Sequence, residues 1–338
     1  MVYCIGHNII SPLGMGSQAN FEAVQAGRSG LKIYTDRFAD VEPFCASLFD
    51  TPQAFVPLCI QSVEDAVSQV RPEAALNLSS KETVFILSTT KGDQLELLRP
   101  AQEIATHFGN PNSPIVVSNA CTSGVCAQIT AMRLLDAGLY RHAVVIGCDL
   151  QSRFIVSGFQ SFKALSPEPC LPFSPERKGL NLGEAVATMV FSNMRQADSC
   201  TDRLQKDWVL EAGSIHNDAN HISAPSRTGD GAYLCLMDVL EGVVPEEIDL
   251  IGVHGTATPY NDAMEQVALE RAGLQDIPRN MLKPYFGHTM GAAGVLETII
   301  CMKEVESRNT NKRKQLIKML SGFGGVNAAI RMRKESEK

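Results

Sequence analysis

The segment Ser118-Asn119-Ala120-Cys121-Thr122-Ser123-Gly124 decides how this chain folds. It follows the apolar run Ile115-Val116-Val117, which predicts a buried strand, and it precedes Val125, Ile129 and Met132 at helical spacing. A strand that turns through small residues into a helix is the building unit of α/β proteins. The segment therefore predicts an α/β fold with Cys121 between a strand end and a helix N-terminus.

The position of Cys121 indicates a nucleophile. Free N–H groups and the positive end of the helix dipole favour a thiolate, so we expect the reactive form to be accessible near neutral pH. The same N–H groups can donate to an oxyanion. Cysteine is also a small and often buried residue, and this structural role is our interpretation of the other nine cysteines.

Short apolar runs alternate with longer amphipathic stretches along the whole chain. Predicted strands cover 2–6, 83–88, 114–118, 143–148, 185–192, 249–253 and 327–332. Predicted helices cover 17–27, 60–70, 121–137, 230–241, 260–272 and 291–306. The alternation favours an α/β protein with largely parallel central sheets.

Two of these strands lead to a reactive side chain, which suggests a duplication. The strand at 114–118 leads to Cys121, and the strand at 249–253 leads to His254. Open α/β sheets usually carry their chemistry at such strand ends. We therefore predict that each of two similar halves presents a reactive group at the end of a strand.

The predicted halves are residues 1–195, with the cysteine, and 196–338, with the histidines, packed as one unit. The polar tract 193–206 is the predicted junction between them. The basic run from Arg308 to Lys318 is expected on a solvated surface.

Two histidines and one aromatic loop complete the candidate site. His254 opens His254-Gly255-Thr256-Ala257-Thr258, and His288 lies in a glycine-rich turn, so small residues leave room for a ligand near both. Either histidine taken alone could be structural. Gly322-Phe323-Gly324-Gly325 is either a mobile loop or a tight turn with a core phenylalanine, and it fits neither a Walker loop nor a dinucleotide-binding fingerprint.

The composition of the 338-residue chain narrows the functional class. A net charge of −7 argues against a broad nucleic-acid surface, and no apolar run approaches the roughly 20 residues that cross a bilayer. Without a recognisable secretory signal, we expect a cytoplasmic protein whose ten cysteines are reduced. Cys121 and Cys126 lack partners at zinc-ligand spacing, so no metal is expected.

Taken together, the motifs resemble the elongating β-ketoacyl synthases of the thiolase superfamily. The resemblance rests on Ala120 to Gly124, His254 to Thr258, Lys283 with Gly287-His288, and Gly322 to Asn327. It is reinforced by Gly158-Phe159 to Ser166, Pro172 to Gly179 and Gly183-Glu184, in family order from Ser11 almost to the C-terminus.

The resemblance implies a duplicated, five-layered αβαβα thiolase-like fold and a catalytic site of Cys121, His254 and His288. In such an enzyme the cysteine accepts an acyl group from the phosphopantetheine arm of acyl carrier protein. Malonyl carrier protein then loses carbon dioxide, and its enolate attacks the acyl thioester. A homodimer or a heterodimer with a related subunit is implied, and no cofactor besides the arm that the carrier protein brings.

The family also implies roles for residues around this triad. The backbone N–H groups of Cys121 and Phe323 would form the oxyanion hole, with Phe323 as the gate. Lys283 would be a supporting residue paired with Glu297, and Asp262 would brace the His254 loop. Two threonines, Thr256 and Thr258, would bind the pantetheine.

Several positions depart from the family pattern. Ser321 stands where many relatives have phenylalanine, Val326 replaces threonine, and Ala185 replaces glycine. The chain is also short before Cys121 and between residues 303 and 320. The alternatives are a nondecarboxylating thiolase, an initiating synthase, a cysteine hydrolase and a noncatalytic or heterodimer-dependent subunit similar to a chain-length factor. The first lacks its second cysteine, the second would have asparagine at His288, and the third leaves Lys283 and the Phe323 loop unexplained.

Overall fold

Two sets of five strands with the same pairing pattern form the main sheet. The structure is a computed structural model that describes residues 1–194, 207–308 and 314–335. The first set is β1 (Val2–Ser11), β5 (Thr83–Ser88), β6 (Ile115–Val117), β7 (His142–Asp149) and β9 (Ala185–Ser192). The second set is β10 (Trp208–Asn217), β11 (Leu250–Gly252), β12 (Arg279–Asn280), β13 (Gln315–Gly322) and β14 (Val326–Lys334).

Three helices of each set occupy equivalent places between the strands, and the other three described helices have no counterpart. The described helices are α1 (Ser17–Gln25), α2 (Phe55–Val67), α3 (Leu98–His107), α4 (Ser123–Asp136), α5 (Arg153–Ser161), α6 (Asp230–Val239), α7 (Pro259–Arg271), α8 (Lys283–Phe286) and α9 (Ala293–Ser307). Three single turns of 3-10 helix cover Pro72–Ala74, Pro245–Glu247 and Met290–Ala292. Four shorter strands are β2 (Gly14–Met15), β3 (Lys32–Tyr34), β4 (Phe44–Ser47) and β8 (Leu182–Gly183).

The strand pairing confirms the duplication. In the first set β1–β9 and β9–β7 are antiparallel, whereas β7–β5 and β5–β6 are parallel. In the second set β10–β14 and β14–β13 are antiparallel, whereas β13–β11 and β11–β12 are parallel. An antiparallel contact between β1 and β10 joins the two sets into one sheet. The sheet is mixed, so the expectation of largely parallel sheets was wrong.

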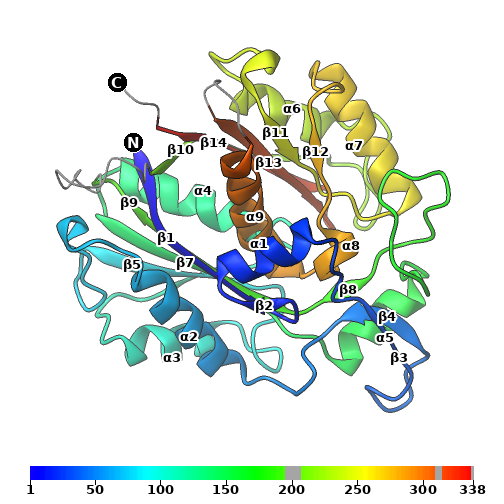
Figure 1. Ribbon diagram of the computed structural model, residues 1–338, viewed down its shortest axis with the longest axis horizontal. Coiled ribbons are helices and arrows are strands. Elements are labelled where there is room, and N and C mark those ends of the chain that lie inside the picture. Colours follow the sequence, from blue (N-terminus) through cyan, green and yellow to red (C-terminus); the bar gives the residue numbers. More distant parts are fainter. Residues whose placement is uncertain (195–206, 309–313, 336–338) are drawn as a thin grey trace.

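Five layers result from the way the helices cover this sheet. Helices α2 and α3 cover the outer face of the first set, and α6 and α7 cover the outer face of the second. Helices α4 and α9 lie between the two sets and contact both, as the centre of Figure 1 shows. The main hydrophobic core surrounds these two helices. This is the predicted αβαβα thiolase-like fold.

The two central helices cross where each has a glycine. A Cβ on Gly124 of α4 would lie 2.8 Å from the Cα of Gly294 of α9, so the backbones touch directly. Gln128 of α4 donates from the same side-chain nitrogen to the carbonyls of both glycines. The crossing fixes the N-terminus of α4, and hence Cys121, against the start of α9.

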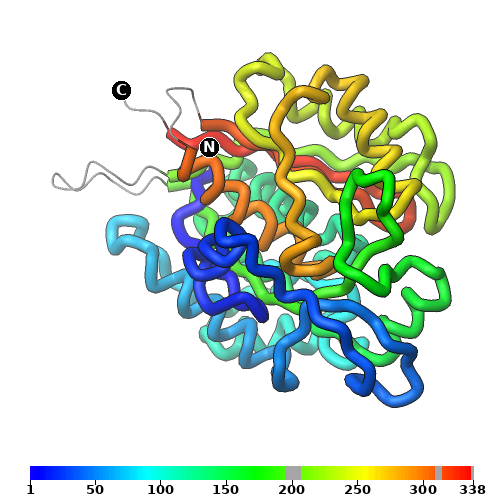
Figure 2. The backbone as a smooth tube through the Cα atoms, turned by 45° about the vertical axis from the view of Figure 1, so that its right-hand side comes forward, coloured from blue at the N-terminus to red at the C-terminus, as the bar shows by residue number. Residues whose placement is uncertain are grey.

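A small three-stranded sheet closes one end of the molecule. Strands β3, β4 and β8 pair in that order, and their apolar side chains pack on α5 through Val156 and Phe159. Figure 2 shows these segments, blue and green, side by side although more than a hundred residues separate them in the chain. The small sheet matters for function because β8 holds the segment that carries His288.

All seven predicted strands and six predicted helices are present, with ends shifted by a few residues. The prediction missed β10, β13, α3 and α5 among the longer elements. It also placed the basic run from Arg308 to Lys318 on the surface, which is wrong for its C-terminal part. That part enters β13, between β11 and β14, and the side chain of Lys318 is fully buried.

The strands before Cys121 and His254 are not equivalent to each other. Topology pairs β6 with β12 and β5 with β11, so Cys121 corresponds to the His288 region and His254 has its counterpart at Thr90. Most of the predicted junction, residues 195–206, lies outside the described residues. All nine described cysteines are free, and no described helix has the length and apolarity needed to cross a membrane.

Candidate active site

Cys121 lies in a tight turn between β6 and α4. Ala120 has a φ of 49°, a conformation that is rare and costly for a residue with a side chain. The turn is held by Asn119, whose N–H donates to Ser123 Oγ at 2.8 Å and whose carbonyl accepts from the Thr122 hydroxyl at 2.7 Å. The sulfur is thereby presented at the helix N-terminus rather than in the helix.

The resting state of Cys121 is the thiol, not the thiolate that the helix N-terminus led us to expect. Burial raises its pKa to about 11, since the residue is only 9% exposed. The Lys283 charge and the backbone N–H groups of Cys121 and Phe323 lower the pKa but do not outweigh burial. Gly322 lets the Phe323 N–H come close to the sulfur, because a side chain at position 322 would crowd the Cys121 backbone. Its Cβ would lie 3.2 Å from the Cys121 nitrogen.

His288 is held by backbone contacts on both sides. Its N–H donates to the carbonyl of Asn181 at 2.6 Å, and its carbonyl accepts from Gly183 at 3.0 Å. This close pairing requires two glycines: a Cβ on Gly287 would lie 2.2 Å from the Leu182 oxygen, and one on Gly183 would lie 1.9 Å from the Phe286 oxygen. The glycines that flank the site in the sequence thus permit the approach of β8 to the His288 segment.

His254 begins the loop after β11, and a buried carboxylate holds this loop. Glu265 of α7 accepts from the backbone N–H groups of His254 at 2.5 Å and Gly255 at 2.7 Å. Burial raises the pKa of Glu265 to about 7. Asp262 accepts from Ala257 in the same loop at 3.2 Å. Sequence reasoning identified Asp262 but missed Glu265, which contacts the histidine itself.

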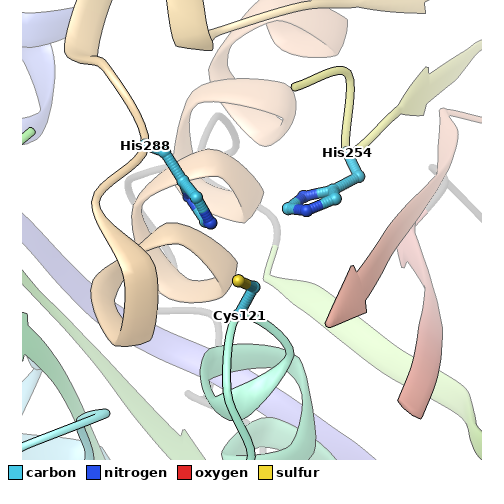
Figure 3. A group of neighbouring side chains, drawn as sticks. All are labelled: Cys121, His254 and His288. Carbon is cyan, nitrogen blue, oxygen red and sulfur yellow. The ribbon is translucent and has the colours of Figure 1, made fainter. Parts of the chain in front are cut away.

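The three predicted residues come together in space. Figure 3 shows His254 and His288 pointing from two different elements toward Cys121. The sulfur and the nearest ring nitrogens all lie within 4.8 Å of one another, and the two imidazole rings are 5.2 Å apart at an angle of 78°.

Both imidazoles are held neutral, and that of His288 is set up as a donor. His288 Nδ1 accepts from the Met290 N–H at 3.4 Å, which assigns the proton to Nε2, and this buried Nε2 has no protein partner. Burial, and then the Lys283 and Lys318 charges, hold the pKa of His288 well below its ordinary value. Burial lowers the pKa of His254 well below its ordinary value. The neighbouring Lys283, His288 and Lys318 lower it further.

A buried ion cluster lies behind the histidines. Lys283 Nζ is 2.7 Å from Glu297 Oε1, and Lys318 Nζ is 2.6 Å from Glu297 Oε2. Burial pushes the pKa of Glu297 up, but the two ammonium groups outweigh it and hold the pKa below its ordinary value. The sequence predicted the first ion pair. It did not predict the second ion pair, because Lys318 lies in a run rich in lysine and arginine, which are usually exposed.

A pocket of about 450 Å³ opens onto the triad. Thr256 and Thr258 line it, with their hydroxyls 2.8 Å apart, and the exposed Lys163 and Lys178 lie at its outer part. Phe323 is 42% exposed, so the alternative of a core phenylalanine is wrong. Its ring packs between Phe159 at 6.1 Å and Phe162 at 6.0 Å.

The same triad is the one cluster of potential metal ligands found among the residues that the structure describes. One sulfur and two imidazole nitrogens are a donor set that suits zinc, with a fourth position left open. Neither histidine, however, has a carboxylate or carbonyl on its second ring nitrogen of the kind that orients metal-binding imidazoles, since the Nδ1 of His254 has no partner and that of His288 accepts an N–H. The surroundings fit neutral hydrogen-bond donors better than metal ligands.

Comparison with known proteins assigns this chain to a family. Residues 100–197 match the description "Beta-ketoacyl synthase, N-terminal domain", and residues 208–312 match "Beta-ketoacyl synthase, C-terminal domain". The chain belongs to the β-ketoacyl synthase family, within the thiolase-like proteins.

Curated relatives carry the name 3-oxoacyl-(acyl-carrier-protein) synthase 2, an acyltransferase name. The protein from Rhizobium meliloti is 30% identical over 66% of this chain and 61% of its own length. The protein from Vibrio cholerae is 27% identical over 88% of this chain and 84% of its own length. The chain thus spans less than two thirds of the first relative and most of the second.

Solved structures show the same fold over the whole chain. A β-ketoacyl synthase from Burkholderia phymatum has a TM-score of 0.86 at 20% identity and covers 99% of both chains. A structure described as a ketosynthase in complex with its chain length factor, from Xenorhabdus doucetiae, has a TM-score of 0.85 at 22% identity, with 99% of this chain and 98% of that chain covered.

Proposed function

We propose that this protein is a β-ketoacyl synthase that condenses an acyl group held on Cys121 with malonyl carrier protein, with loss of carbon dioxide. The observation that carries the proposal is the meeting of one buried thiol and two neutral imidazoles at the end of an open pocket. A cysteine hydrolase needs one imidazole as a base and leaves the second without a role. A decarboxylating condensation uses both.

The first step transfers the acyl group to the enzyme. Cys121 Sγ attacks the thioester carbonyl, the carbonyl electrons move to oxygen, and the pantetheine thiolate leaves and takes up the proton that Cys121 loses. The N–H groups of Cys121 and Phe323, which both face the sulfur, are placed to stabilise the oxyanion. Because burial raises the pKa of Cys121 to about 11, the thiol is the main form at neutral pH and loses its proton before or during the attack.

The second step makes and uses the carbon nucleophile. When the malonyl thioester loses carbon dioxide, the electron pair of the broken C–C bond forms an enolate whose charge lies on the thioester oxygen. Nε2–H of His288 and the pocket-facing nitrogen of His254 donate to this oxygen while remaining neutral. The enolate carbon then attacks the acyl thioester, and the Cys121 thiolate leaves and takes up a proton.

The substrate arm and the partner follow from the same chemistry. Thr256 and Thr258 present hydroxyls for the amides of a phosphopantetheine arm, and Lys163 adds positive charge for an acidic carrier protein, whereas Lys178 is paired with Glu168. The arm is part of the substrate, and we propose no resident metal or cofactor. A cytoplasmic location remains a prediction.

Acyl transfer to Cys121 is the first test. The purified protein is incubated with carrier protein charged with acyl chains of different length, and its intact mass is followed. We expect a mass increase in the wild type and in Cys126→Ala, a matched control one helical turn away that is also buried. The increase should be absent in Cys121→Ala. Transfer that survives in Cys121→Ala would contradict the assignment of the nucleophile.

A chain-length-factor-like subunit is the second candidate. Solved structures with the same fold include ketosynthase and chain-length-factor pairs. Such a subunit would accept no acyl group at Cys121 from any carrier protein when tested alone. Transfer that appears only with a related subunit added would place the catalytic chain in a heterodimer.

A further inference from the structure

Lys318 is a fully buried lysine in the middle of the second strand set, and the proposed reaction gives it no role. It lies on β13, with Gly252 opposite it on β11. Its Nζ donates to three oxygens: the carbonyls of Gly252 at 3.1 Å and Val253 at 2.9 Å, and Glu297 at 2.6 Å. All three hydrogens of the ammonium therefore have acceptors.

These three partners connect the two histidines. The carbonyls belong to the two residues directly before His254, whereas Glu297 belongs to α9, the helix after His288. Glu297 also binds Lys283, which begins the helix before His288. Lys318 is thus the link between the strand end that carries His254 and the segment that carries His288.

The backbone opposite Lys318 is adapted to it. A Cβ on Gly252 would lie 2.8 Å from Cδ of Lys318 and 2.7 Å from Sγ of Cys301, so only glycine leaves room for the lysine stem. A lysine that only filled space in the core would not need its ammonium to reach two backbone carbonyls. The steric fit and the complete set of acceptors are independent observations, and both indicate a fixed position for the ammonium.

The cluster carries excess positive charge. Two ammonium groups share the carboxylate of Glu297, and the side chains of all three are at most 3% exposed. The other titratable groups facing the histidines are Cys121 and, on α7, Glu265 and Asp262. Asp149 is paired with Lys91 and hydrogen-bonded to Gly291 behind the thiol. The net effect of the two lysines on both imidazoles is to disfavour their protonation.

We propose that Lys318 is a positioning residue of the condensing site: its ammonium ties the strand end that carries His254 to the segment that carries His288 and so fixes the two imidazoles relative to each other. The proposal rests on the proposed function, in which the two imidazoles donate hydrogen bonds to the enolate oxygen. It concerns decarboxylation and not acyl transfer, because the contacts of Lys318 lead to the histidine segments, whereas the Lys283 charge acts on the Cys121 thiol.

The test compares two half-reactions in Lys318→Met, Lys283→Met and a matched control. Lys334→Met is the control, because it also removes a lysine–glutamate pair from a strand of the second set, with Nζ and the Glu306 oxygen 2.6 Å apart, away from the triad. In Lys318→Met we expect malonyl decarboxylation to fall about 10- to 100-fold, the size of effect that misplaced catalytic groups produce, with acyl transfer to Cys121 changed less than about threefold. Lys283→Met should impair both half-reactions, and Lys334→Met neither.

The pH dependence distinguishes positioning by charge from simple packing. Without the Lys318 charge the pKa values of His254 and His288 rise, so the acid limb of decarboxylation moves to higher pH. Lys318→Gln keeps a donor for the carbonyls but lacks the charge, and it should show the same movement. A folded Lys318→Met protein that has the wild-type decarboxylation rate and acid limb would overturn the proposal.

A histidine titration by NMR needs no turnover. With signals assigned through His254→Gln and His288→Gln, both rings should take up a proton at higher pH in Lys318→Met and Lys318→Gln than in the wild type, whereas Lys334→Met should titrate like the wild type. Unchanged titration of both rings in a folded Lys318 variant would overturn the proposal. Absence of both half-reactions in the wild type, by contrast, counts against the proposed function, and the comparison of titrations still decides the role of Lys318.

Discussion

At the scale of single residues, Cys121 combines a strained turn, a helix N-terminus and burial, and these influences oppose one another. The dipole and two N–H groups favour the thiolate, but burial dominates and leaves a pKa of about 11. The sequence indicated the first two influences and gave no measure of the third. Burial depends on how α9 and the Phe323 loop close over the turn, which is a tertiary property.

Alkylation of Cys121 should therefore depend steeply on pH. We expect the rate with iodoacetamide to rise about tenfold per pH unit from pH 7 to near pH 11, because only the thiolate reacts. Intact mass after timed labelling measures the rate, and Cys121→Ala gives the background from other thiols. A plateau already at pH 8 would contradict the high pKa and restore the expectation of an activated thiolate.

Removal of the His288 donor should separate the two half-reactions. In His288→Ala the enolate loses one neutral N–H donor, so malonyl decarboxylation should fall about 10²- to 10³-fold, the usual effect of losing one oxyanion donor. Release of carbon dioxide from malonyl carrier protein measures this step.

Acyl transfer in the same variant should remain within a few-fold of the wild type, because the oxyanion of that step faces backbone N–H groups. Equal loss of both half-reactions would mean that His288 acts on Cys121 rather than on the enolate. The acid limb of wild-type decarboxylation should lie well below pH 6.5, since both imidazoles resist protonation.

Recognition of site residues from sequence depended on their local surroundings. Cys121 and His254 each follow a predicted strand, His288 lies in a glycine-rich turn, and small residues surround all three, a pattern that is visible in one dimension. Glu265 and Lys318 lie eleven and sixty-four residues after His254 in ordinary helical and strand contexts. Their importance comes from backbone groups that only the folded chain brings to them.

At the scale of helices and strands, the crossing of α4 and α9 is the contact that sets the site. Gly124→Ala should destabilise the protein by about 1–3 kcal/mol and lower acyl transfer, because its Cβ would meet the Gly294 backbone, which cannot move aside as a side chain can. Urea denaturation and the acylation rate measure the two effects.

The matched control for this crossing is Gly158→Ala on α5, another helical glycine with no atom within 4 Å of the new Cβ. It should leave stability unchanged or raise it slightly, since alanine favours helix. Similar losses in the two variants would mean that the close approach of α4 and α9 has no special weight.

The ion cluster joins α8, β13 and α9, so its loss should be felt by all three. Glu297→Gln leaves two buried ammonium groups without their counter-charge and should lower the free energy of unfolding by about 3–5 kcal/mol at pH 7. Glu103→Gln, which removes a partner of the exposed Arg99, should cost less than about 1 kcal/mol.

The pH dependence of this stabilisation has a definite sign. The pKa of Glu297 is lower in the folded protein than its ordinary value of 4.5, so the stabilisation is complete above pH of about 4.5 and is lost as the pH falls through the lowered value. The stability difference between wild type and Glu297→Gln should therefore shrink in acid. A difference that grows as the pH falls below 4.5 would contradict the charge pairing.

Prediction of whole elements succeeded where the apolar pattern was regular and failed where buried polar residues interrupted it. Strands β5 and β7 are fully buried, have polar residues only at their ends, and were predicted almost to the residue. Strand β13 is equally buried but contains Gln315, Lys318 and Ser321, whose polar groups bind other buried groups. Such compensation cannot be read from composition, so the strand was assigned to a solvated surface.

At the scale of the whole molecule, the main sheet ends in two edges of different character. The edge strand β12 has two residues and begins with Arg279, whereas β6 at the other end is Ile115-Val116-Val117, half-buried and entirely apolar. An apolar edge strand is a template for pairing with another chain. Near it, α3 packs on β6, and exposed leucines precede and begin this helix.

We therefore expect the protein to dimerise through the β6 end of the sheet. Light scattering with size exclusion should give about twice the chain mass of 36.7 kDa at micromolar concentration. Leu95→Glu/Leu98→Glu, at positions 63% and 52% exposed, should shift the protein toward monomer, because charge at a packed apolar face is costly. Leu139→Glu, 66% exposed just after α4, is the control and should stay dimeric. A monomeric wild type, or a double variant that dimerises as strongly as the control, would contradict dimerisation through the β6 end of the sheet.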